Sequence, residues 1–303
     1  MWMRRTVFSM AILGLGLGFA GAMPATAWAG DVLDRIKAEK IIRFGFRVDA
    51  PPFSAIVNGE PSGFSVDLCK LLAGTIKDQD QLQDFTARMI PVGTGQRFDA
   101  LAAGEIDVLC GATTTTLERR ELVSFSIPTF LTGVSVATRK DAPASLRSVL
   151  IDNDNPAVTD TEVAEALRGA RLGVRRDTTA ADWLTTGPLD GVPDVSLSSY
   201  DNHATAMREL RDGVIDAYFA DQAILFGFLK ANDGADFVVS QKTFTYEPYA
   251  LALPRGDEDF RLLVDRALSR IYKADGMVGL IERHFGRASP SILLFYLQTA
   301  LPE

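Results

Sequence analysis

The sequence contains few of the residues that commonly bind metals or carry catalysis. Its 303 residues include only two cysteines and two histidines, and neither a Cys-x-x-Cys pair nor a Cys/His metal spacing is present. A zinc site or a redox-active cysteine pair is therefore not indicated. A Gly-x-Ser-x-Gly nucleophile motif is also absent, so the sequence offers no sign of an α/β-hydrolase. We expect no cofactor.

Long apolar runs are also scarce, and the main one is N-terminal. Two arginines precede an apolar stretch from residue 7 to 22, and small residues around Ala29 suit a signal peptidase. We expect residues 1–29 to be a signal peptide and the mature chain to start near Gly30. The general secretory route is favoured over the twin-arginine route, because any signal peptide carries a few basic residues at its start. A Gly-x-Gly-x-Gly run inside the signal peptide is not interpreted as a dinucleotide loop.

Acidic residues outnumber basic ones, 39 to 31. The formal net charge is −8, and it becomes −10 without residues 1–29, whose only charges are Arg4 and Arg5. A nucleic-acid partner or a surface for anionic lipid is therefore not expected. The apolar runs at 262–268 and 292–297 are shorter than the roughly 20 residues of a membrane span. The sequence predicts a soluble envelope or secreted protein.

The two cysteines, Cys69 and Cys110, form an even pair in a chain bound for an oxidising compartment, which favours a disulfide. Cys69 falls on a predicted helix and Cys110 at the end of a predicted strand. A helix packed beside that strand could bring the two within bridging range. Two buried free thiols are the alternative, since the sequence does not give the separation of the Cα atoms.

Strand and helix patterns alternate along the first third of the chain. Short strands are expected at 41–46, 87–92 and 106–110, with helices at about 65–76 and 96–103 between them. This order is typical of a parallel α/β lobe. A polar stretch at 141–156 changes the composition, and the same alternation then resumes. Two lobes are therefore expected.

Two segments of the sequence are similar to each other. Residues 97–107 and 206–216 each contain a leucine-bearing helix, then a glycine, and then Ile-Asp leading into a strand. The similarity indicates one architecture used twice. The alternative is that any helix joined to a strand through glycine would look alike.

The stretch from 104 to 128 joins a strand to hydroxyls and a guanidinium. The strand runs into Cys110, Gly111 and Ala112, four threonines follow, and the sequence continues through Arg119 to a Phe-Ser pair. Threonine hydroxyls, free N–H groups beyond a strand end and a planar arginine suit the recognition of a small carboxylate. Ligands of open α/β sheets also bind outside the carboxyl ends of the strands.

This stretch resembles the motif of periplasmic solute-binding proteins that serve ABC importers of polar amino acids. In that family, Thr-x-Thr-x-Glu-Arg and an aromatic-Ser pair follow a Gly-rich strand end, and the matching residues here are Thr114, Thr116, Glu118, Arg119, Phe125 and Ser126. The Cys-Gly-x-Thr-Thr form is similar to the glutamate/aspartate-binding branch. The resemblance extends from about residue 31 to 287.

The resemblance implies an α/β fold of two Rossmann-like lobes joined by a two-strand hinge, the type II periplasmic binding protein fold. Residues 30–132 and 248–303 would form lobe 1, and 133–247 would form lobe 2, with crossings near 132–136 and 243–247. It also implies a monomeric periplasmic protein that encloses an amino acid, glutamate or aspartate, by hinge closure. Its partner would be the inner-membrane permease of an ABC transporter.

Arg119 is the residue expected at the ligand α-carboxylate, assisted by the hydroxyl and N–H of Thr114. An isolated arginine here would rather be a helix-surface residue, but its place in the family motif favours the binding role. Asp221 ends a strand of the second lobe, where the resemblance implies a partner for the ligand ammonium. Its alternative role is to cap the next helix.

Side-chain specificity is expected at Arg47, within an Arg-x-x-x-x-Pro-Phe-Ser segment that in the family branch reaches the distal carboxylate. His203 matches a histidine near the ligand, although a lone histidine is more often a surface or helix-start residue. Thr178 matches the family's Gly-Thr-Thr turn, where Asp177 replaces the glycine and should cap the helix. Ala112 stands where the branch has serine, so a hydroxyl is lost.

Two other functions fit the same fold. A periplasmic prephenate or arogenate dehydratase would need an acid in the cleft, which Asp49 or Asp221 could supply. A sensory module that docks on a membrane receptor would share the binding chemistry and differ only in its partner. We expect a binding protein rather than an enzyme.

Overall fold

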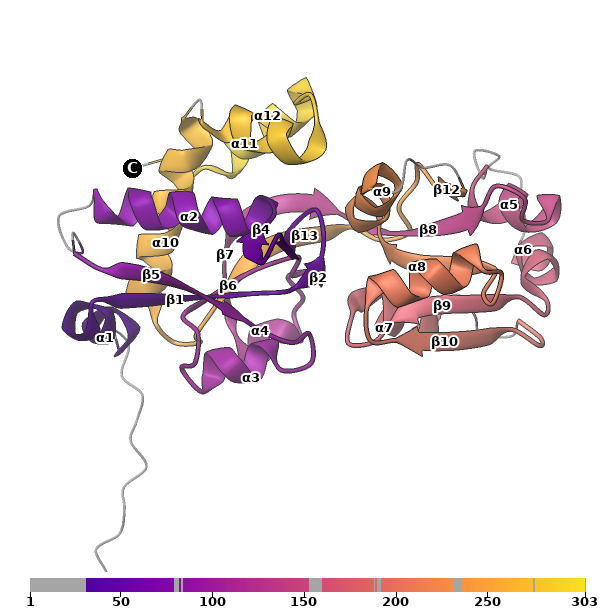
Figure 1. The fold of residues 1–303 in the computed structure, drawn as a ribbon, viewed down its shortest axis with the longest axis horizontal. Helices are drawn as coiled ribbons and strands as arrows, with labels where there is room; N and C mark the ends of the chain where they lie inside the picture. Colours follow the sequence, from indigo (N-terminus) through magenta and orange to yellow (C-terminus); the bar gives the residue numbers. More distant parts are fainter. Residues whose placement is uncertain are drawn as a thin grey trace, which may run out of the picture.

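The computed structural model describes residues 31–302 except 79–81, 83, 153–159, 188, 190–191, 232–235 and 275. These residues form two α/β lobes side by side, and the C-terminal helices return to the first lobe (Figure 1). The expected signal peptide, residues 1–29, lies outside the described residues. Within them, no helix is long and apolar enough to cross a membrane.

The first lobe is built on a five-stranded sheet. Its strands, in spatial order, are β5 (Thr86–Pro91), β1 (Ile41–Phe46), β6 (Val108–Cys110), β13 (Glu247–Leu253) and β7 (Ser124–Thr132). β1 pairs in parallel with β5 and β6, whereas β13 runs antiparallel to β6 and β7. A small sheet of β2 (Asp49–Ala50), β3 (Ser54–Val57) and β4 (Glu60–Ser62) lies beside it.

Helices cover both faces of this sheet. They are α1 (Asp31–Glu39), α2 (Phe64–Lys77), α3 (Arg97–Ala102), α4 (Arg119–Leu122), α10 (Glu258–Lys273), α11 (Gly276–Phe285) and α12 (Pro290–Thr299). The larger core packs α2, α10 and α11 on one face, and a smaller core packs α3 on the other. Apolar residues recur at helical spacing on α2 and α10, which fixes the face that each buries.

The second lobe has the same design. Its sheet contains, in order, β10 (Ser196–Tyr200), β9 (Arg171–Arg175), β11 (Ala217–Asp221), β8 (Val134–Arg139) and β12 (Phe237–Val239). Its helices are α5 (Ala144–Leu150), α6 (Asp160–Leu167), α7 (Thr179–Thr186), α8 (His203–Arg211) and α9 (Gln222–Ala231). β9 is parallel to β10 and β11, and β8 is antiparallel to β11 and β12.

The two similar segments, residues 97–107 and 206–216, occupy equivalent positions in the two lobes. Each runs from a helix through a glycine at positive φ, +69° at Gly104 and +72° at Gly213, into the third strand of its sheet. The aspartate that follows accepts a bond from a backbone N–H of the neighbouring strand: Asp107 from Arg43 of β1 at 2.7 Å, and Asp216 from Arg171 of β9 at 2.9 Å. The sequence similarity therefore reflects a structural repeat.

The chain passes between the sheets twice, once from β7 to β8 and once from β12 to β13. The two passages contact each other closely: Phe244 N donates to the Val134 carbonyl at 2.7 Å, and Val134 N donates to Thr245 Oγ1 at 2.9 Å. A Cβ on Gly133 would lie 2.0 Å from the Thr245 carbonyl oxygen, so only glycine fits there. We propose that residues 30–132 and 248–303 form lobe 1 and that residues 133–247 form lobe 2. The sheets support these limits, because β7 and β13 belong to the first sheet and β8 and β12 to the second.

Two features hold the strand ends next to the cleft. Cys69 of α2 and Cys110 of β6 form a disulfide with Cα atoms 6.2 Å apart, as expected. In the second lobe, Trp183 of α7 stacks on Phe244 of the second passage, with ring centroids 5.1 Å apart and an angle of 18° between the rings. The disulfide thus fixes the end of β6, and the stacked rings hold the second passage against α7.

Candidate functional site

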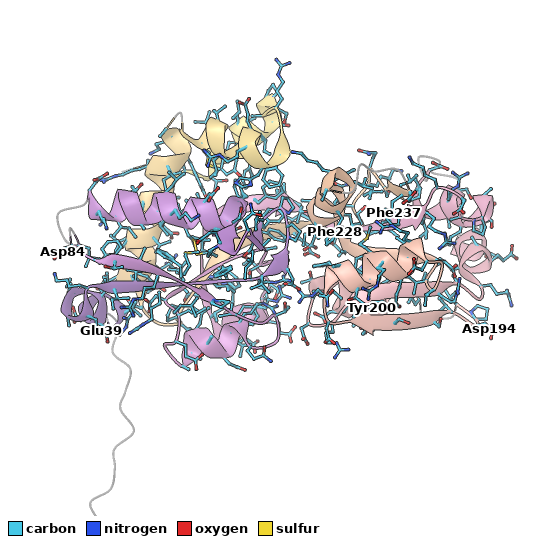
Figure 2. All side chains as sticks on the ribbon, viewed as in Figure 1. Glu39, Asp84, Asp194, Tyr200, Phe228 and Phe237 are labelled. Carbon is cyan, nitrogen blue, oxygen red and sulfur yellow. A yellow bond between two sulfur atoms is a disulfide. The ribbon has the colours of Figure 1, made fainter. Side chains whose placement is uncertain are left out.

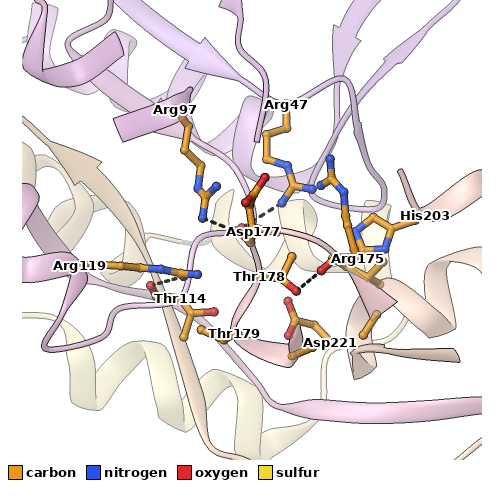
Figure 3. Close-up of a pocket in the computed structure, with 14 residues that line it drawn as sticks. Arg47, Arg97, Thr114, Arg119, Arg175, Asp177, Thr178, Thr179, His203 and Asp221 are labelled. Atoms are coloured by element: carbon orange, nitrogen blue, oxygen red, sulfur yellow. Dashed lines mark hydrogen bonds between the residues drawn. The ribbon is translucent and has the colours of Figure 1, made fainter. Parts of the chain in front are cut away.

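A cavity lies between the two lobes, whose side chains are drawn in Figure 2. The space between its walls that no atom fills is about 370 Å³, and this includes a part open to solvent. Its wall includes all seven residues predicted to bind ligand: Arg47, Ala112, Thr114 and Arg119 from the first lobe, and Thr178, His203 and Asp221 from the second (Figure 3).

Thr114 is held by a single bridge to Tyr249 of β13. The residues that flank them make the two hydrogen bonds of this bridge, at 2.9 and 3.1 Å. Thr114 therefore points its own N–H and carbonyl away from β13, because an extended residue directs both groups to the same side. Its carbonyl accepts a hydrogen bond from Arg119 Nη1 at 2.9 Å, so the N–H faces the same side as that guanidinium.

The Thr114 hydroxyl has a different partner from the one expected. It donates to Glu247 Oε2 at 2.6 Å, and Thr179 Oγ1 of the second lobe donates to the same oxygen at 2.7 Å. Thr245 donates to the other carboxylate oxygen at 3.0 Å. The buried Glu247 thus joins hydroxyls of both lobes, and the N–H of Thr114 is the group left to face the cavity.

Two arginines of the first lobe, Arg119 and Arg97, also line the cavity. Burial lowers the pKa of Arg119, and the negative charge of Glu247 opposes the shift. Burial and the positive charges of Arg119 and Arg47 lower the pKa of Arg97 to about 9. Arg97 donates to the Thr94 carbonyl and, across the cleft, to the Asp177 carbonyl at 3.2 Å. With a pKa of about 9, the Arg97 guanidinium stays protonated at neutral pH.

The turn before α7 differs from the expectation. Asp177 does not cap the helix; it has φ +60°, a left-handed conformation that explains a glycine at this place in the family. Thr178 is the N-cap, since its hydroxyl accepts a bond from Ala181 N at 3.3 Å. The N-terminus of α7, whose first N–H groups have no partner within the helix, meets the cavity at Thr178, Thr179 and Ala180.

Asp221 stands at the end of β11, where the sequence placed it. Its carboxylate accepts a hydrogen bond from Tyr249 Oη across the cleft. Burial and the nearby negative charge of Glu247 raise the pKa of Asp221 to about 7, although Tyr249, Arg47 and Arg119 act in the opposite direction. The site can therefore hold this carboxyl in either protonation state near neutral pH.

Arg47 and His203 lie together on the other side of the cavity (Figure 3). The Arg47 backbone is fixed by Ser54 Oγ, which donates to its carbonyl at 2.6 Å, and Arg47 Nη1 donates to the Ala112 carbonyl at 3.5 Å. His203 is fully buried, with Nδ1 2.7 Å from Tyr218 Oη. Burial and the positive charge of Arg47 lower the pKa of His203 to about 3, so the imidazole is neutral.

Seven other residues line the wall, and three of these carry side-chain donors that the sequence did not assign to ligand binding: Arg97, Arg175 and Thr179. Arg175 ends β9 just as Asp221 ends β11, so the rule that ligands sit at the carboxyl ends of strands could have found it. Thr179 follows the predicted Thr178 in the same turn. Arg97 lies in the first turn of a predicted helix and has no comparable signal.

The described residues thus form a bilobal protein, with two α/β lobes, two crossing segments and a charged cavity between the lobes. The profile of the bacterial extracellular solute-binding proteins, family 3, matches residues 42–287. The chain belongs to this family. Both the family and the type II periplasmic binding fold that the sequence predicted are confirmed.

Relatives differ in their ligands. The glutamate/aspartate import solute-binding protein of Salmonella typhimurium is 26% identical over 272 residues, covering 89% of this chain and 84% of the relative. The glutamine-binding protein of a Bacillus subtilis ABC transporter is 25% identical over 95% of this chain and 99% of the relative. An ancestral amino acid-binding protein, described as a precursor of cyclohexadienyl dehydratase, has TM-score 0.67 and 25% identity over 84% of this chain and 99% of its own.

Proposed function

We propose that this chain is the substrate-binding component of an ABC importer for amino acids and that its ligand is glutamate or aspartate. The observation that carries the proposal is the charge arrangement of the cavity. Arg119 and Arg47 come from separate segments of the first lobe, and Asp221 faces them from the second. An acidic amino acid carries two carboxylates and one ammonium, and burial of these charges requires a partner for each.

The proposed pose assigns one group to each charge. The α-carboxylate binds the Arg119 guanidinium and the Thr114 N–H, and the N-terminus of α7 at Thr178 approaches it from the other lobe. The ammonium pairs with Asp221. The distal carboxylate is bound by Arg47 with His203 beside it, while Ala112 offers its backbone alone. Because the ligand contacts both lobes, it stabilises the closed arrangement over an open one.

The cellular setting of the proposal rests on the sequence and the family. Residues 1–29 have the pattern of a secretory signal, which supports a periplasmic protein processed near Ala29. The partner is then an inner-membrane ABC permease that receives the ligand from a monomeric binding protein. Loss of amino-acid uptake on deletion of the gene would separate this role from that of a sensory module.

A second candidate function is a dehydratase of the same fold. A buried carboxyl whose pKa lies at about 7, as Asp221 has, could donate a proton in the cleft. The ancestral protein of similar fold is described as the precursor of such an enzyme. Conversion of prephenate by the purified protein would establish this alternative, and an unchanged substrate would remove it.

Calorimetric titration of the mature protein against the twenty amino acids tests the main proposal. Heat is expected with glutamate or aspartate, and the bound ligand should stabilise the native state by about 2.7 kcal/mol at a hundredfold excess over Kd. Arg119→Gln should abolish both signals, whereas the exposed neighbour Arg120→Gln should retain them. The absence of heat with every amino acid would overturn the proposal.

A further inference from the structure

Arg175, the last residue of β9, is an unassigned part of the cavity wall. It is 4% exposed, and most of its guanidinium has partners. Nη2 is 2.7 Å from Asp49 Oδ2, and Nε and Nη2 donate to the Asp201 carbonyl at 3.2 and 2.9 Å. Nη1, however, is buried without any hydrogen-bond partner. A buried charged donor left unsatisfied is costly, so an acceptor is expected to fill this place.

Asp49 links the two lobes at this point. It belongs to β2 of the first lobe, and its second oxygen is 3.5 Å from Arg47 Nη2. One carboxylate therefore contacts a guanidinium from each lobe, Arg47 from the first and Arg175 from the second. The ion pair with Arg175 can form only while the lobes are together, and it fixes the orientation of that guanidinium in the closed cleft.

Two more buried nitrogens without partners belong to the same cavity wall, Arg47 Nε and His203 Nε2. The Tyr218 phenol is buried and stays protonated, and its oxygen can donate to His203 Nδ1 or accept from it. In the tautomer in which Tyr218 donates, the imidazole hydrogen is on Nε2. Two guanidinium N–H groups, joined in that tautomer by the imidazole N–H, thus lack an acceptor.

The charges of this group define the acceptor. Arg47 and Arg175 contribute two positive charges, Asp49 one negative charge, and the neutral His203 none, so one positive charge is left over. A group with a single negative charge and only acceptor atoms satisfies both the charge and the donors. A carboxylate does so, whereas an amide would direct its own N–H groups at donors.

We propose that Arg175 is a specificity-determining residue, which binds the distal carboxylate of the ligand from the second lobe while Arg47 binds it from the first. Asp49 is a positioning residue, since it holds Arg175 without touching the ligand. This inference rests on the proposed binding of an acidic amino acid. It adds that the full preference for acids over their amides requires the lobes to be closed, because Arg175 belongs to the second lobe and Arg47 to the first.

The test compares wild type, Arg175→Gln and Arg176→Gln by calorimetry with glutamate, aspartate, glutamine and asparagine. Arg176 is the matched control, because it is the adjacent arginine and its side chain is 52% exposed. Arg175→Gln should weaken the binding of the acids by about 30-fold or more and change amide binding less than threefold. Arg176→Gln should match wild type for all four ligands.

Arg175→Lys is a second test variant, which keeps the proposal testable if Arg175→Gln does not fold. Lysine keeps the ion pair with Asp49 but lacks the second arm of the guanidinium, so an intermediate loss for acids alone is expected. Unchanged acid binding in both Arg175 variants, or an equal loss for acids and amides, would overturn the proposal. Failure of the wild type to bind any of the four ligands would instead reject the proposed function, and this inference with it.

Discussion

Proton release on ligand binding follows from the state of Asp221 in the cavity. In the ligand-free site, burial and Glu247 raise the pKa of its carboxyl to about 7 from an ordinary value of 3.8. A ligand ammonium placed beside it favours the ionised form and lowers that pKa again. Binding at pH 7 should therefore release about half a proton per ligand, since about half of the carboxyls are protonated there.

The affinity should follow the same linkage. Ligand binding requires the ionised carboxylate, so Kd should rise about tenfold for each pH unit below 7 and be about a hundredfold higher at pH 5 than at pH 8. The ligand's own carboxylates do not contribute, because they remain ionised in this range. His203, with a pKa of about 3, and Tyr249, whose pKa is raised well above its usual value, stay neutral throughout this range and do not contribute either.

Calorimetry in two buffers of different ionisation enthalpy measures the protons released, and titrations from pH 5 to 8 measure Kd. Asp221→Asn is the control: it should bind more weakly but with no pH dependence and no proton release. The reasoning would be refuted by a constant Kd over this range in the wild type. A pH dependence that survives in Asp221→Asn would assign the proton to another group.

Three further outcomes are expected. Replacing Cys69 and Cys110 by alanine should lower the free energy of unfolding by about 4 kcal/mol, on the chain-entropy estimate for a sequence separation of 41; an unchanged midpoint in urea would contradict this. Gly133→Ala should cost about 1–3 kcal/mol, because its Cβ meets the Thr245 carbonyl oxygen at 2.0 Å, and equal stability in the same assay would argue against the close crossing. Glu247→Gln should open the ligand-free protein, because hydroxyls of both lobes share its carboxylate; small-angle scattering should then give a larger radius of gyration than wild type, and an equal one would contradict the link.

The alternation of apolar runs predicted β1, β5 and β6 of the first sheet, but not β7. β7 was missed because Pro128 lies within it, and proline removes a hydrogen bond from a ladder. The structure resolves the conflict by placing β7 at the edge of its sheet, where that loss is tolerated. α12 was not predicted either, because the apolar run at 292–297 was compared only with the length of a membrane span. In the structure this helix starts at Pro290 and buries Tyr296.

For the site, the sequence predicted those residues that follow a strand end or belong to a family motif. It did not predict which polar groups would pair across the cleft. Glu247 contacts Thr114 and Thr179, which are 133 and 68 residues away in the chain, and such contacts depend on how the two lobes meet. The partners of Arg175 were hidden for the same reason. Pairing between lobes is a property of the closed fold rather than of any local pattern.

The stacking of Trp183 on Phe244 provides an optical signal for hinge movement. The other two tryptophans, Trp2 and Trp28, lie in the expected signal peptide, so the mature chain would contain this one alone. Phe244 belongs to the second passage between the lobes, and rotation of the hinge would change the contact between the two rings. Intrinsic fluorescence of the unlabelled protein would thus follow closure in real time, and Phe244→Leu would remove the signal without altering the cavity wall.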